Sequence, residues 1–423
     1  MKKMNTSPIS GMQEFLPDTQ ATFNKLKTKI GEVYHRHGFL NIETPTIDRL
    51  DILLAKAGGD TEKQIYKVVK TAESNDDADQ GLRFDHTVPL ARYVVEHEND
   101  LTFPFKVSQI GRNFRGERAQ KGRFREFYQC DVDVIGRESL SSLYDADVIS
   151  TLLDAYDQFE LDTPVLARIS NRKILTGFLR DLQIIEKAGD IYSIVDHSEK
   201  VAPEETKKAL VELGLSDGIV VKILKFMDLN GGKKEVIKEL KEFGVQDEMF
   251  ADGVAELEQV LELLEADGLD KKITADMKIV RGLDYYTGTV FEFCLPEYNQ
   301  IGSVGGGGRY DNLAGYFTEQ KLPGVGGSIG LSRLFYVLNE NGLIKNRIDK
   351  PVDYAVIPMS DEQIGFALKV AKRLRNEENS VTVVYMDKKL GDKLTYAAKI
   401  AKNGIVIGED EVASGEYKVK TFN

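Results

Sequence analysis

The stretch that decides the fold is FRGERAQKGRFREFYQCDVDVI, residues 114–135. It holds a basic loop, residues 116–123, and then a run in which side-chain character alternates. Because successive side chains of a strand point to opposite faces, one face carries a cation, an aromatic ring, an amide and two carboxylates: Arg125, Phe127, Gln129, Asp131 and Asp133. Such a face is costly to bury unless a ligand satisfies it. The alternative is the solvated face of an antiparallel sheet.

Extended segments on both sides of the basic loop predict a large antiparallel hairpin over residues 103–135. A smaller hairpin is predicted around the polar run at residues 71–80. Residues 171–270 then change to helical periodicity, and glycines stand at the predicted helix ends: Gly214, Gly244 and Gly268. This region is interpreted as a helical insertion.

The two ends of the chain differ in pattern. Near the start, apolar residues at helical spacing predict a helix with Asp18 as its cap and Gly38 as its left-handed stop. After residue 350, strand-like and helix-like segments alternate. This alternation predicts a small α/β domain with a mostly parallel sheet.

Composition limits the class of protein. The chain has 423 residues, 42% of them hydrophobic and 29% charged, which fits a globular protein of two to four domains. Its apolar runs are far shorter than the roughly 20 residues of a membrane span. The first residues lack the apolar core of a secretory signal. A cytoplasmic protein without a membrane partner is expected.

The cysteines, the histidines and the net charge bear on metal and nucleic-acid binding. Cys130 and Cys294 are the only cysteines, and neither they nor the five histidines have the spacing of a metal site, so none is predicted. The net charge of −12 argues against a nucleic-acid partner on average. Residues 351–423, however, hold 11 basic and 11 acidic residues, so the excess negative charge lies entirely in residues 1–350.

Arginines and glycines point to a phosphate ligand. Guanidinium groups, which bind phosphate in bidentate fashion, gather in and beside the basic loop: Arg112, Arg115, Arg118 and Arg123. Polar groups also follow four glycines, as Arg309, Tyr310 and Asp311, and glycines precede Arg333. Neither a P-loop nor a dinucleotide-binding fingerprint is present. A nucleotide would therefore bind on the antiparallel sheet.

These features together resemble the class II aminoacyl-tRNA synthetases, and specifically the histidyl-tRNA synthetase family. The stretches that carry the resemblance are residues 11–17 (GMQEFLP), 38–45 (GFLNIETP, motif 1), 114–118 with 122–127 (FRGER and GRFREF, motif 2), 324–334 (GVGGSIGLSRL, motif 3), 281–286 (RGLDYY) and 307–311 (GGRYD). The last two are the stretches specific to the family.

The resemblance implies a multidomain fold of α+β and α/β parts. Residues 1–170 and 271–340 would form a catalytic domain, a class II antiparallel sheet flanked by helices. Residues 171–270 would be the helical insertion, and residues 351–423 a small α/β domain of the anticodon-binding type. Motif 1 would form the interface of a homodimer.

The resemblance also implies roles for single residues at the ATP site. Arg115 would hold the α-phosphate and act in catalysis. Glu117 would meet the adenine amino group, and Phe127 would stack on adenine. Arg123 and Arg333 would bind the γ-phosphate end.

For histidine, the α-amino group would be held by Asp85, Thr87 and Gln129. The imidazole would be surrounded by Asp133, Tyr286 and Tyr310, with Tyr285 also assigned to the histidine pocket. A second catalytic arginine, Arg281, would lie beside the α-phosphate and the histidine. Gln120 and Lys121 of the basic loop would contact tRNA.

The function implied is the ATP-dependent ligation of L-histidine to its tRNA through histidyl-adenylate, with Mg²⁺ accompanying ATP. One alternative is a non-catalytic, histidine-sensing regulatory paralogue that controls histidine biosynthesis. Such proteins lack the anticodon-binding domain and the motif 2 arginines, whereas this sequence has both. A plain RNA-binding module is the third possibility, but it would not need the polar pocket residues.

Overall fold

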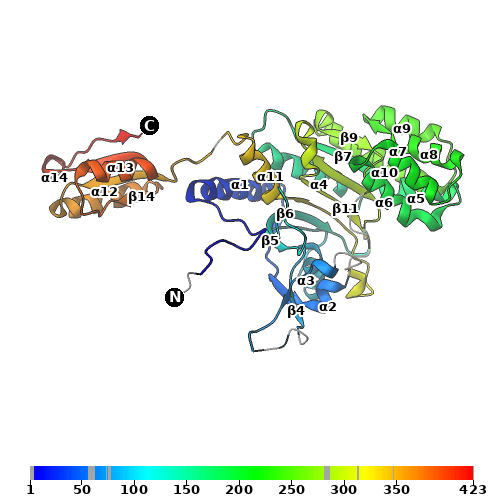
Figure 1. Ribbon diagram of the computed structural model, residues 1–423, viewed down its shortest axis with the longest axis horizontal. Coiled ribbons are helices and arrows are strands. Elements are labelled where there is room, and N and C mark those ends of the chain that lie inside the picture. The colour runs from blue at the N-terminus through cyan, green and yellow to red at the C-terminus, as the bar shows by residue number, and fades with distance from the viewer. Residues whose placement is uncertain are drawn as a thin grey trace. The chain divides into compact units, whose positions relative to one another are not determined.

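The computed structural model describes residues 4–55, 62–72, 74, 78–280, 286–311, 314–345 and 347–422 (Figure 1). The chain forms two compact units, which are treated separately below. The first consists of Met1–Gln13 and Leu26–Lys345, and the second of Glu14–Lys25 and Asn346–Asn423.

A mixed sheet of nine described strands is the centre of the first unit, in the order β1-β5-β6-β12-β11-β10-β7-β9-β8. Its strands are β1 (Leu40–Asn41), β5 (Phe105–Phe114), β6 (Glu126–Ile135), β7 (Leu166–Asn171), β8 (Asn230–Gly231), β9 (Ile273–Asp276), β10 (Thr289–Cys294), β11 (Gly305–Tyr310) and β12 (Gly324–Ile329). Only the β1–β5 and β7–β9 pairs among them are parallel. The predicted large hairpin is confirmed as β5 and β6, which pair from Phe105↔Ile135 to Phe114↔Glu126.

A smaller sheet, β2-β4-β3, holds the second predicted hairpin. Its strands are β2 (Ile47–Arg49), β3 (Lys67–Val68) and β4 (Gln80–Leu82), and β3 pairs antiparallel with β4, as predicted. Two helices accompany it, α2 (Leu50–Leu54) and α3 (Thr87–Glu96). The buried side of α3 packs with the start of β5 through Leu90, Val94 and Phe105.

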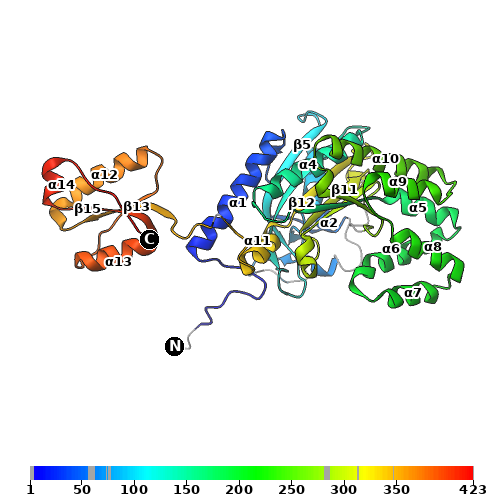
Figure 2. The ribbon, with the colours of Figure 1, turned by 90° about the horizontal axis from the view of Figure 1, so that it is seen from above.

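The glycines of β11 and β12 have a packing cause that the sequence did not reveal. These strands lie side by side, with Gly307 opposite Gly327. A Cβ on Gly327 would come within 2.7 Å of Leu152 in helix α4 (Leu143–Asp157) and within 2.8 Å of Phe291. The missing side chains therefore let α4 approach the sheet closely (Figure 2). Helix α11 (Leu331–Glu340) follows β12 directly.

Between β7 and β9 the chain is largely helical, the green region of Figure 1. Its helices are α5 (Arg172–Asp181), α6 (Ala188–His197), α7 (Pro203–Glu212), α8 (Asp217–Met227), α9 (Lys233–Glu242) and α10 (Glu248–Ala266). Gly214, Gly244 and Gly268 have left-handed φ values of 75°, 70° and 80° just after α7, α9 and α10. These predicted helix ends are confirmed, because glycine adopts this conformation without steric cost.

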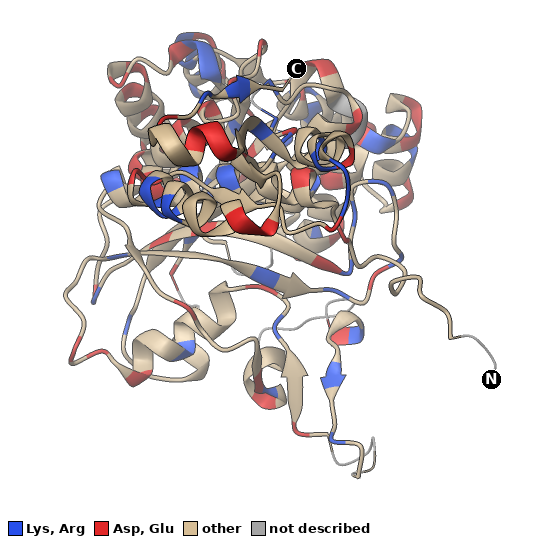
Figure 3. Cartoon of the chain, turned by 90° about the vertical axis from the view of Figure 1, so that its left-hand side faces the viewer, with Lys and Arg blue, Asp and Glu red and all other residues tan. Residues whose placement is uncertain are grey.

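The second unit contains a four-stranded sheet in the order β14-β13-β15-β16. The elements are β13 (Val352–Pro358), α12 (Ile364–Asn376), β14 (Val381–Val383), α13 (Leu390–Ile400), β15 (Ala401–Ile407), α14 (Glu409–Ser414) and β16 (Lys420–Thr421). The first three strands in chain order are parallel, and β16 is antiparallel to β15. The predicted α/β alternation is confirmed. Basic and acidic residues are interspersed along the chain (Figure 3).

Two local predictions need correction. Helix α1 (Pro17–Arg36) begins before Asp18, so this residue lies in the first turn and is not the cap. Gly38, with a φ of 81°, does stop the helix as predicted. The sequence of residues 277–295 is strand-like in pattern; the structure has the strand β10 (Thr289–Cys294) in this stretch, but residues 277–280 form a turn and coil.

Short 3₁₀ helices complete the described structure: η1 (Glu62–Gln64), η3 (Ile185–Lys187), η4 (Ser198–Lys200), η5 (Asp270–Lys272), η6 (Pro296–Ile301), η7 (Ala314–Tyr316) and η8 (Asp361–Gln363). Within the described ranges, every helix is too short or too polar to cross a bilayer.

Candidate active site

A cleft of about 520 Å³ lies over the polar face of β6. Its lining includes Phe127 and Gln129 of β6, glycines of β11 and residues of the loop between β5 and β6. The predicted site residues that line it are Arg115, Glu117, Arg123, Phe127, Gln129, Tyr286 and Arg333. The residues predicted for ATP thus come together, although motif 2 and motif 3 are about 200 positions apart in the sequence.

A smaller cavity of about 150 Å³ adjoins this cleft. The two hollows share Arg115, Gln129, Tyr286 and Ser328 in their walls. The predicted histidine-site residues that line the smaller cavity are Asp85, Thr87, Gln129, Asp133, Tyr286 and Tyr310. The cavity walls therefore combine carboxylates, an amide and two phenols.

Some predicted site residues lie elsewhere. Gln120 and Lys121 are exposed on the loop between β5 and β6 and line neither hollow. Arg281 and Tyr285 lie outside the described residues. Their predicted roles stay predictions.

Arg115 is held between two aromatic rings at the boundary of the cleft and the cavity. Its guanidinium carbon lies 4.3 Å from the centre of the Phe84 ring and 5.0 Å from that of Phe127. The Nε atom donates to the Phe84 carbonyl oxygen at 3.4 Å. Cation–π contacts of this kind fix a cation while leaving charge available to an anion. Sequence reasoning gave Phe84 no contact role.

The basic loop brings charges of both signs to the cleft. Arg123 Nη1 lies 3.6 Å from Glu117 Oε2, and both side chains are partly exposed. An exposed ion pair of this length contributes little to stability. The pair can therefore open to bind a ligand at small cost.

Asp133 is a buried carboxylate at the floor of the cavity. It accepts a hydrogen bond from the Tyr310 hydroxyl at 2.8 Å. Burial, assisted by the nearby Asp131 carboxylate, raises the pKa of Asp133 to about 8, although the Tyr310 hydrogen bond opposes that shift. Gly326 makes room for it, since a Cβ there would lie 1.9 Å from Asp133 Oδ1.

Asp85 stands at the entrance to helix α3. Its Oδ1 accepts a hydrogen bond from the backbone N–H of Val88 at 3.0 Å, which fixes the carboxylate at the positive end of the helix. Burial raises the pKa of Asp85 above its usual value, although the Val88 hydrogen bond and the charge of Arg115 oppose this shift. Asp85 and Thr87 thus reach the cavity from the helix that follows β4.

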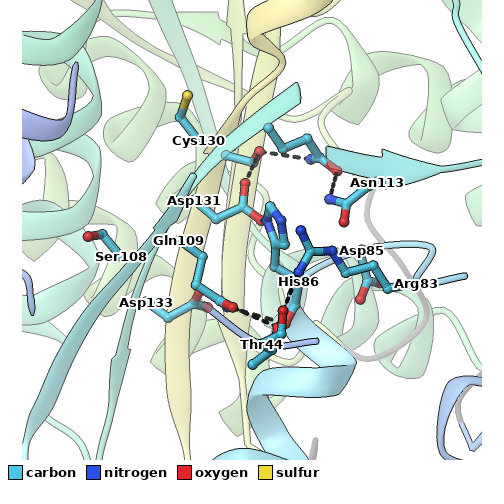
Figure 4. A network of polar contacts seen from close by, with 12 residues as sticks. Thr44, Arg83, Asp85, His86, Ser108, Gln109, Asn113, Cys130, Asp131 and Asp133 are labelled. Atoms are coloured by element: carbon cyan, nitrogen blue, oxygen red, sulfur yellow. Dashed lines mark hydrogen bonds and ion pairs between the residues drawn. The ribbon is translucent and has the colours of Figure 1, made fainter. Parts of the chain in front are cut away.

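A hydrogen-bond network that the sequence did not predict lies beside the cavity (Figure 4). Gln129 Nε2 donates to Ser328 Oγ at 2.8 Å, and Gln129 Oε1 accepts from Asn113 Nδ2 at 2.8 Å. Ser328 Oγ in turn contacts Asp131 Oδ1. The other oxygen of Asp131 lies 2.8 Å from His86 Nδ1. Strand alternation indicated the face of Asp131, but no sequence signal marked His86 or Ser328.

Arg309 of the GGRYD stretch has a structural position. Its guanidinium forms a buried ion pair with Asp145 of α4, with Nη2 2.6 Å from Oδ1. It also donates to the carbonyl oxygens of Leu140 and Ser141. Because side chains alternate along β11, Tyr310 reaches the cavity and Arg309 points into the core.

The described residues contain no group of three or more His, Cys, Asp or Glu side chains that could hold a metal ion. Cys130 is buried, and Cys294 is partly buried. Arg115, Arg123 and Arg333 bring positive charge to the walls of the cleft.

Comparison with known families gives two matches that together cover most of the chain. Residues 11–334 match the family model described as histidyl-tRNA synthetase. Residues 353–423 match the model described as an anticodon binding domain.

Individual proteins agree with this result. The chain is 46% identical to a histidine–tRNA ligase of Clostridium tetani, over 100% of this chain and 95% of that protein. The crystal structure of histidyl-tRNA synthetase from Nostoc sp. PCC 7120 has a TM-score of 0.89 and 38% identity, covering 99% of this chain and 95% of that one.

A second solved structure shares the fold alone. It is described as an ATP phosphoribosyltransferase regulatory subunit/histidyl-tRNA synthetase from Bacillus halodurans C. Its TM-score is 0.79 at 21% identity, covering 96% of this chain and all of that one.

Proposed function

The chain belongs to the histidyl-tRNA synthetase family and ligates histidine to tRNA, and from that premise we propose that it first activates histidine with ATP in the cleft over β6. The observation that carries this proposal is the position of Arg115, which lines both the cleft and the smaller cavity. A nucleotide phosphate and an amino-acid carboxylate are both anions and must be brought together to react. A cation common to two adjoining hollows supports that reaction.

The regulatory alternative gains no support. Relatives that match nearly the whole chain at 40–46% identity are histidine–tRNA ligases. The likeness to the Bacillus halodurans structure is one of fold. The arginines of the basic loop and the second unit, which the regulatory alternative would lack, are both present.

In the first step, a carboxylate oxygen of histidine attacks the α-phosphorus of ATP. The bond between that phosphorus and the bridging oxygen breaks, and pyrophosphate leaves with its electron pair. Arg115 stabilises the negative charge that gathers on the phosphate oxygens, which is the main contribution asked of the protein. In the second step, a hydroxyl of the terminal tRNA ribose attacks the carbonyl carbon of the adenylate, and AMP leaves.

For ATP, we infer that Phe127 stacks on adenine and Glu117 accepts from its amino group. Arg123 and Arg333, both in the cleft wall, would bind the γ-phosphate end. Arg281, predicted to act beside Arg115, lies outside the described residues.

For histidine, the buried Asp133 would accept a hydrogen bond from the imidazole. Tyr310 orients this carboxylate by donating to it. Such an acceptor distinguishes imidazole from flat apolar side chains, because those would leave it unpaired. Asp85, Thr87 and Gln129 would hold the α-amino group, and Tyr286 would close the cavity.

The remaining expectations are proposals of the same kind. Mg²⁺ would arrive on the phosphates of ATP, where Glu292, a carboxylate lining the cleft, offers an oxygen ligand of the type it prefers. The chain would act in the cytoplasm as a homodimer, with Gln120 and Lys121 contacting tRNA. The division at residues 1–170, 171–270, 271–340 and 351–423 also stays a prediction.

The test is histidine-dependent exchange of labelled pyrophosphate into ATP. We expect exchange with L-histidine and none above background with L-phenylalanine or L-glutamine, which are of similar size. Charging of tRNA would then need the protein, L-histidine and ATP together with tRNA. Absence of histidine-dependent exchange by folded protein would refute activation at this site.

A further inference from the structure

The roles proposed above do not use the buried pair His86 and Asp131. Their side chains are 1% and 6% exposed, and Asp131 Oδ2 lies 2.8 Å from His86 Nδ1. Asp131 lines the smaller cavity. His86 instead lines a separate cavity of about 280 Å³. It is therefore a buried polar group one residue removed from the cavity in which histidine would bind.

The hydrogen bonds that start at this pair have a fixed direction. An ionised carboxylate only accepts hydrogen bonds, so His86 Nδ1 and Ser328 Oγ must both donate to Asp131. Once Ser328 donates its only proton, its oxygen is left to accept from Gln129 Nε2. The Gln129 amide is thereby fixed with its nitrogen toward Ser328 and its oxygen on the other side.

In this series of hydrogen bonds, Asp131 is the residue whose role as acceptor cannot be exchanged for that of a donor. The hydroxyl of Ser328 rotates, and the amides of Gln129 and Asn113 can each exchange oxygen and nitrogen by turning over. Asn113 gives no independent anchor, since its Oδ1 is buried without a hydrogen-bond partner among the described residues. The orientation of Gln129 therefore depends on how Asp131 is held.

His86 holds Asp131 in that orientation. By occupying Oδ2, it leaves Oδ1 to face Ser328. The imidazole is itself confined: a Cβ at Gly111 would lie 3.0 Å from His86 Nε2 and 2.5 Å from Arg83 Nη2. Arg83 is fixed by donating to the carbonyl oxygens of Thr44 and Arg112. Only a glycine at position 111 leaves space for both groups.

We propose that His86 is a positioning residue for amino-acid recognition: through Asp131 and Ser328 it makes Gln129 present its amide oxygen to the α-ammonium group of histidine. This inference rests on the proposed function, because it assigns Gln129 to the substrate's amino group. An ammonium only donates hydrogen bonds, so a reversed amide would present a donor to a donor. His86 itself touches neither substrate.

The test compares His86→Leu with His86→Asn in the pyrophosphate exchange assay. Leucine fills the space but cannot donate. Asparagine places a neutral N–H close to the position of Nδ1. We expect His86→Leu to raise the KM for histidine about 10- to 100-fold, the effect of losing one hydrogen bond to a charged group. The KM for ATP should change less than about threefold, and His86→Asn should recover most of the loss. His197→Leu, at an exposed histidine of α6, is the matched control.

A second readout separates positioning from general damage. Imidazolepropionate has the ring and carboxylate of histidine but lacks the α-ammonium. Its inhibition constant should be nearly the same for the wild type and His86→Leu, whereas the KM for histidine differs. Equal weakening of both molecules, or an unchanged KM for histidine, would overturn the proposal.

Two further outcomes concern a His86→Leu variant that does not fold and a wild type without exchange activity. If His86→Leu does not fold, Ser328→Ala breaks the same series of hydrogen bonds between Asp131 and Gln129. This variant should show the same selective rise in the KM for histidine. An unchanged KM for histidine in Ser328→Ala would also overturn the proposal. If the wild type itself lacks histidine-dependent exchange, the proposed function has failed. A wild type that exchanges normally, with unaffected variants, refutes the role of His86 alone.

Discussion

The two sheets of this chain differ in the kind of side chain that their inner strands bury. In the nine-stranded sheet, β6 buries the carboxylates Asp131 and Asp133 against the smaller cavity. In the four-stranded sheet, the matching central strand β13 buries Ala355, Val356 and Ile357. The first is mostly antiparallel and can leave one face to a ligand, while parallel strands are usually covered on both faces.

Apolar clusters on both faces of β13 show this covering. Val356 packs with residues of α12, and Ala355 and Ile357 pack with Ala397 of α13. A polar group on either face would have no ligand to satisfy it. Any binding by the second unit must therefore use helix surfaces and loops, whereas the first unit can bind within its sheet.

The largest expected effect concerns one buried cation in each unit, Arg309 in the first and Lys393 in the second. Arg309 is paired with the buried carboxylate of Asp145, whereas Lys393 donates to the carbonyl oxygen of Pro358. Arg309→Ala leaves a buried charge without its partner and should cost about 3–5 kcal/mol. Lys393→Met removes that hydrogen bond and a longer one, at 3.4 Å, to the Met359 carbonyl oxygen, and should cost about 1–2 kcal/mol. Hydrogen exchange of β11 and β13 amides reads the two sheets separately. An equal loss of stability in β11 and β13 would contradict the predicted difference between the two substitutions.

The next effect tests the cleft. Arg115→Ala should lower histidine-dependent exchange about 100- to 1000-fold, since it removes a donor aimed at developing charge. Arg112, near the end of β5, is the control, because its side chain is largely exposed and paired with Glu126. Arg112→Ala should retain at least half the activity. Near-normal exchange by Arg115→Ala, with the fold intact by circular dichroism, would show that the cleft is not the reaction site.

A third, smaller effect concerns the floor of the cavity. Because the pKa of Asp133 is raised to about 8, this carboxyl group is mostly protonated at pH 7 when no ligand is bound. The ionised carboxylate accepts a hydrogen bond from imidazole more strongly than the neutral acid does, so histidine binding should favour the ionised form and release a proton. The affinity should therefore rise about fivefold between pH 7 and pH 8 and level off above about pH 9, for a total rise of about tenfold.

Asp133→Asn should abolish that rise and weaken histidine binding far more than ATP binding. Calorimetry in buffers of different ionisation enthalpy measures the released proton directly. A slope that survives the substitution would assign the titration to another group. Equal weakening of histidine and ATP would mean that Asp133 serves the fold alone.

The sequence predicted much of this contrast, and it failed where tertiary contacts decide. Strand alternation placed Gln129 and Asp133 on one face, because period two is a local property. Alternation also separates Arg309 from Tyr310, yet only the position of Asp145, 164 residues away, shows which of them is structural. His86, just before α3, and Ser328, in β12, meet at Asp131 of β6. No local pattern carries such a meeting.

The smallest effect tests whether the second unit binds by its helix surface. Lys369 and Lys372 are exposed on α12, while its buried side packs on the sheet. Each phosphate contact adds about 0.7–0.9 to the slope of log affinity against log salt. Lys369→Glu with Lys372→Glu should therefore reduce the salt slope of tRNA binding by about 1.4–1.8 and leave pyrophosphate exchange unchanged.

The matched control is Lys418→Glu with Lys420→Glu, which changes the charge of the same unit equally at exposed positions in and beside β16. If both double variants reduce the slope by the same amount, net charge explains the effect and α12 makes no specific contact. If only the α12 variant does so, its cations touch phosphates. Because adenylate formation uses the first sheet, a loss of exchange in either variant would contradict the division of labour between the two sheets.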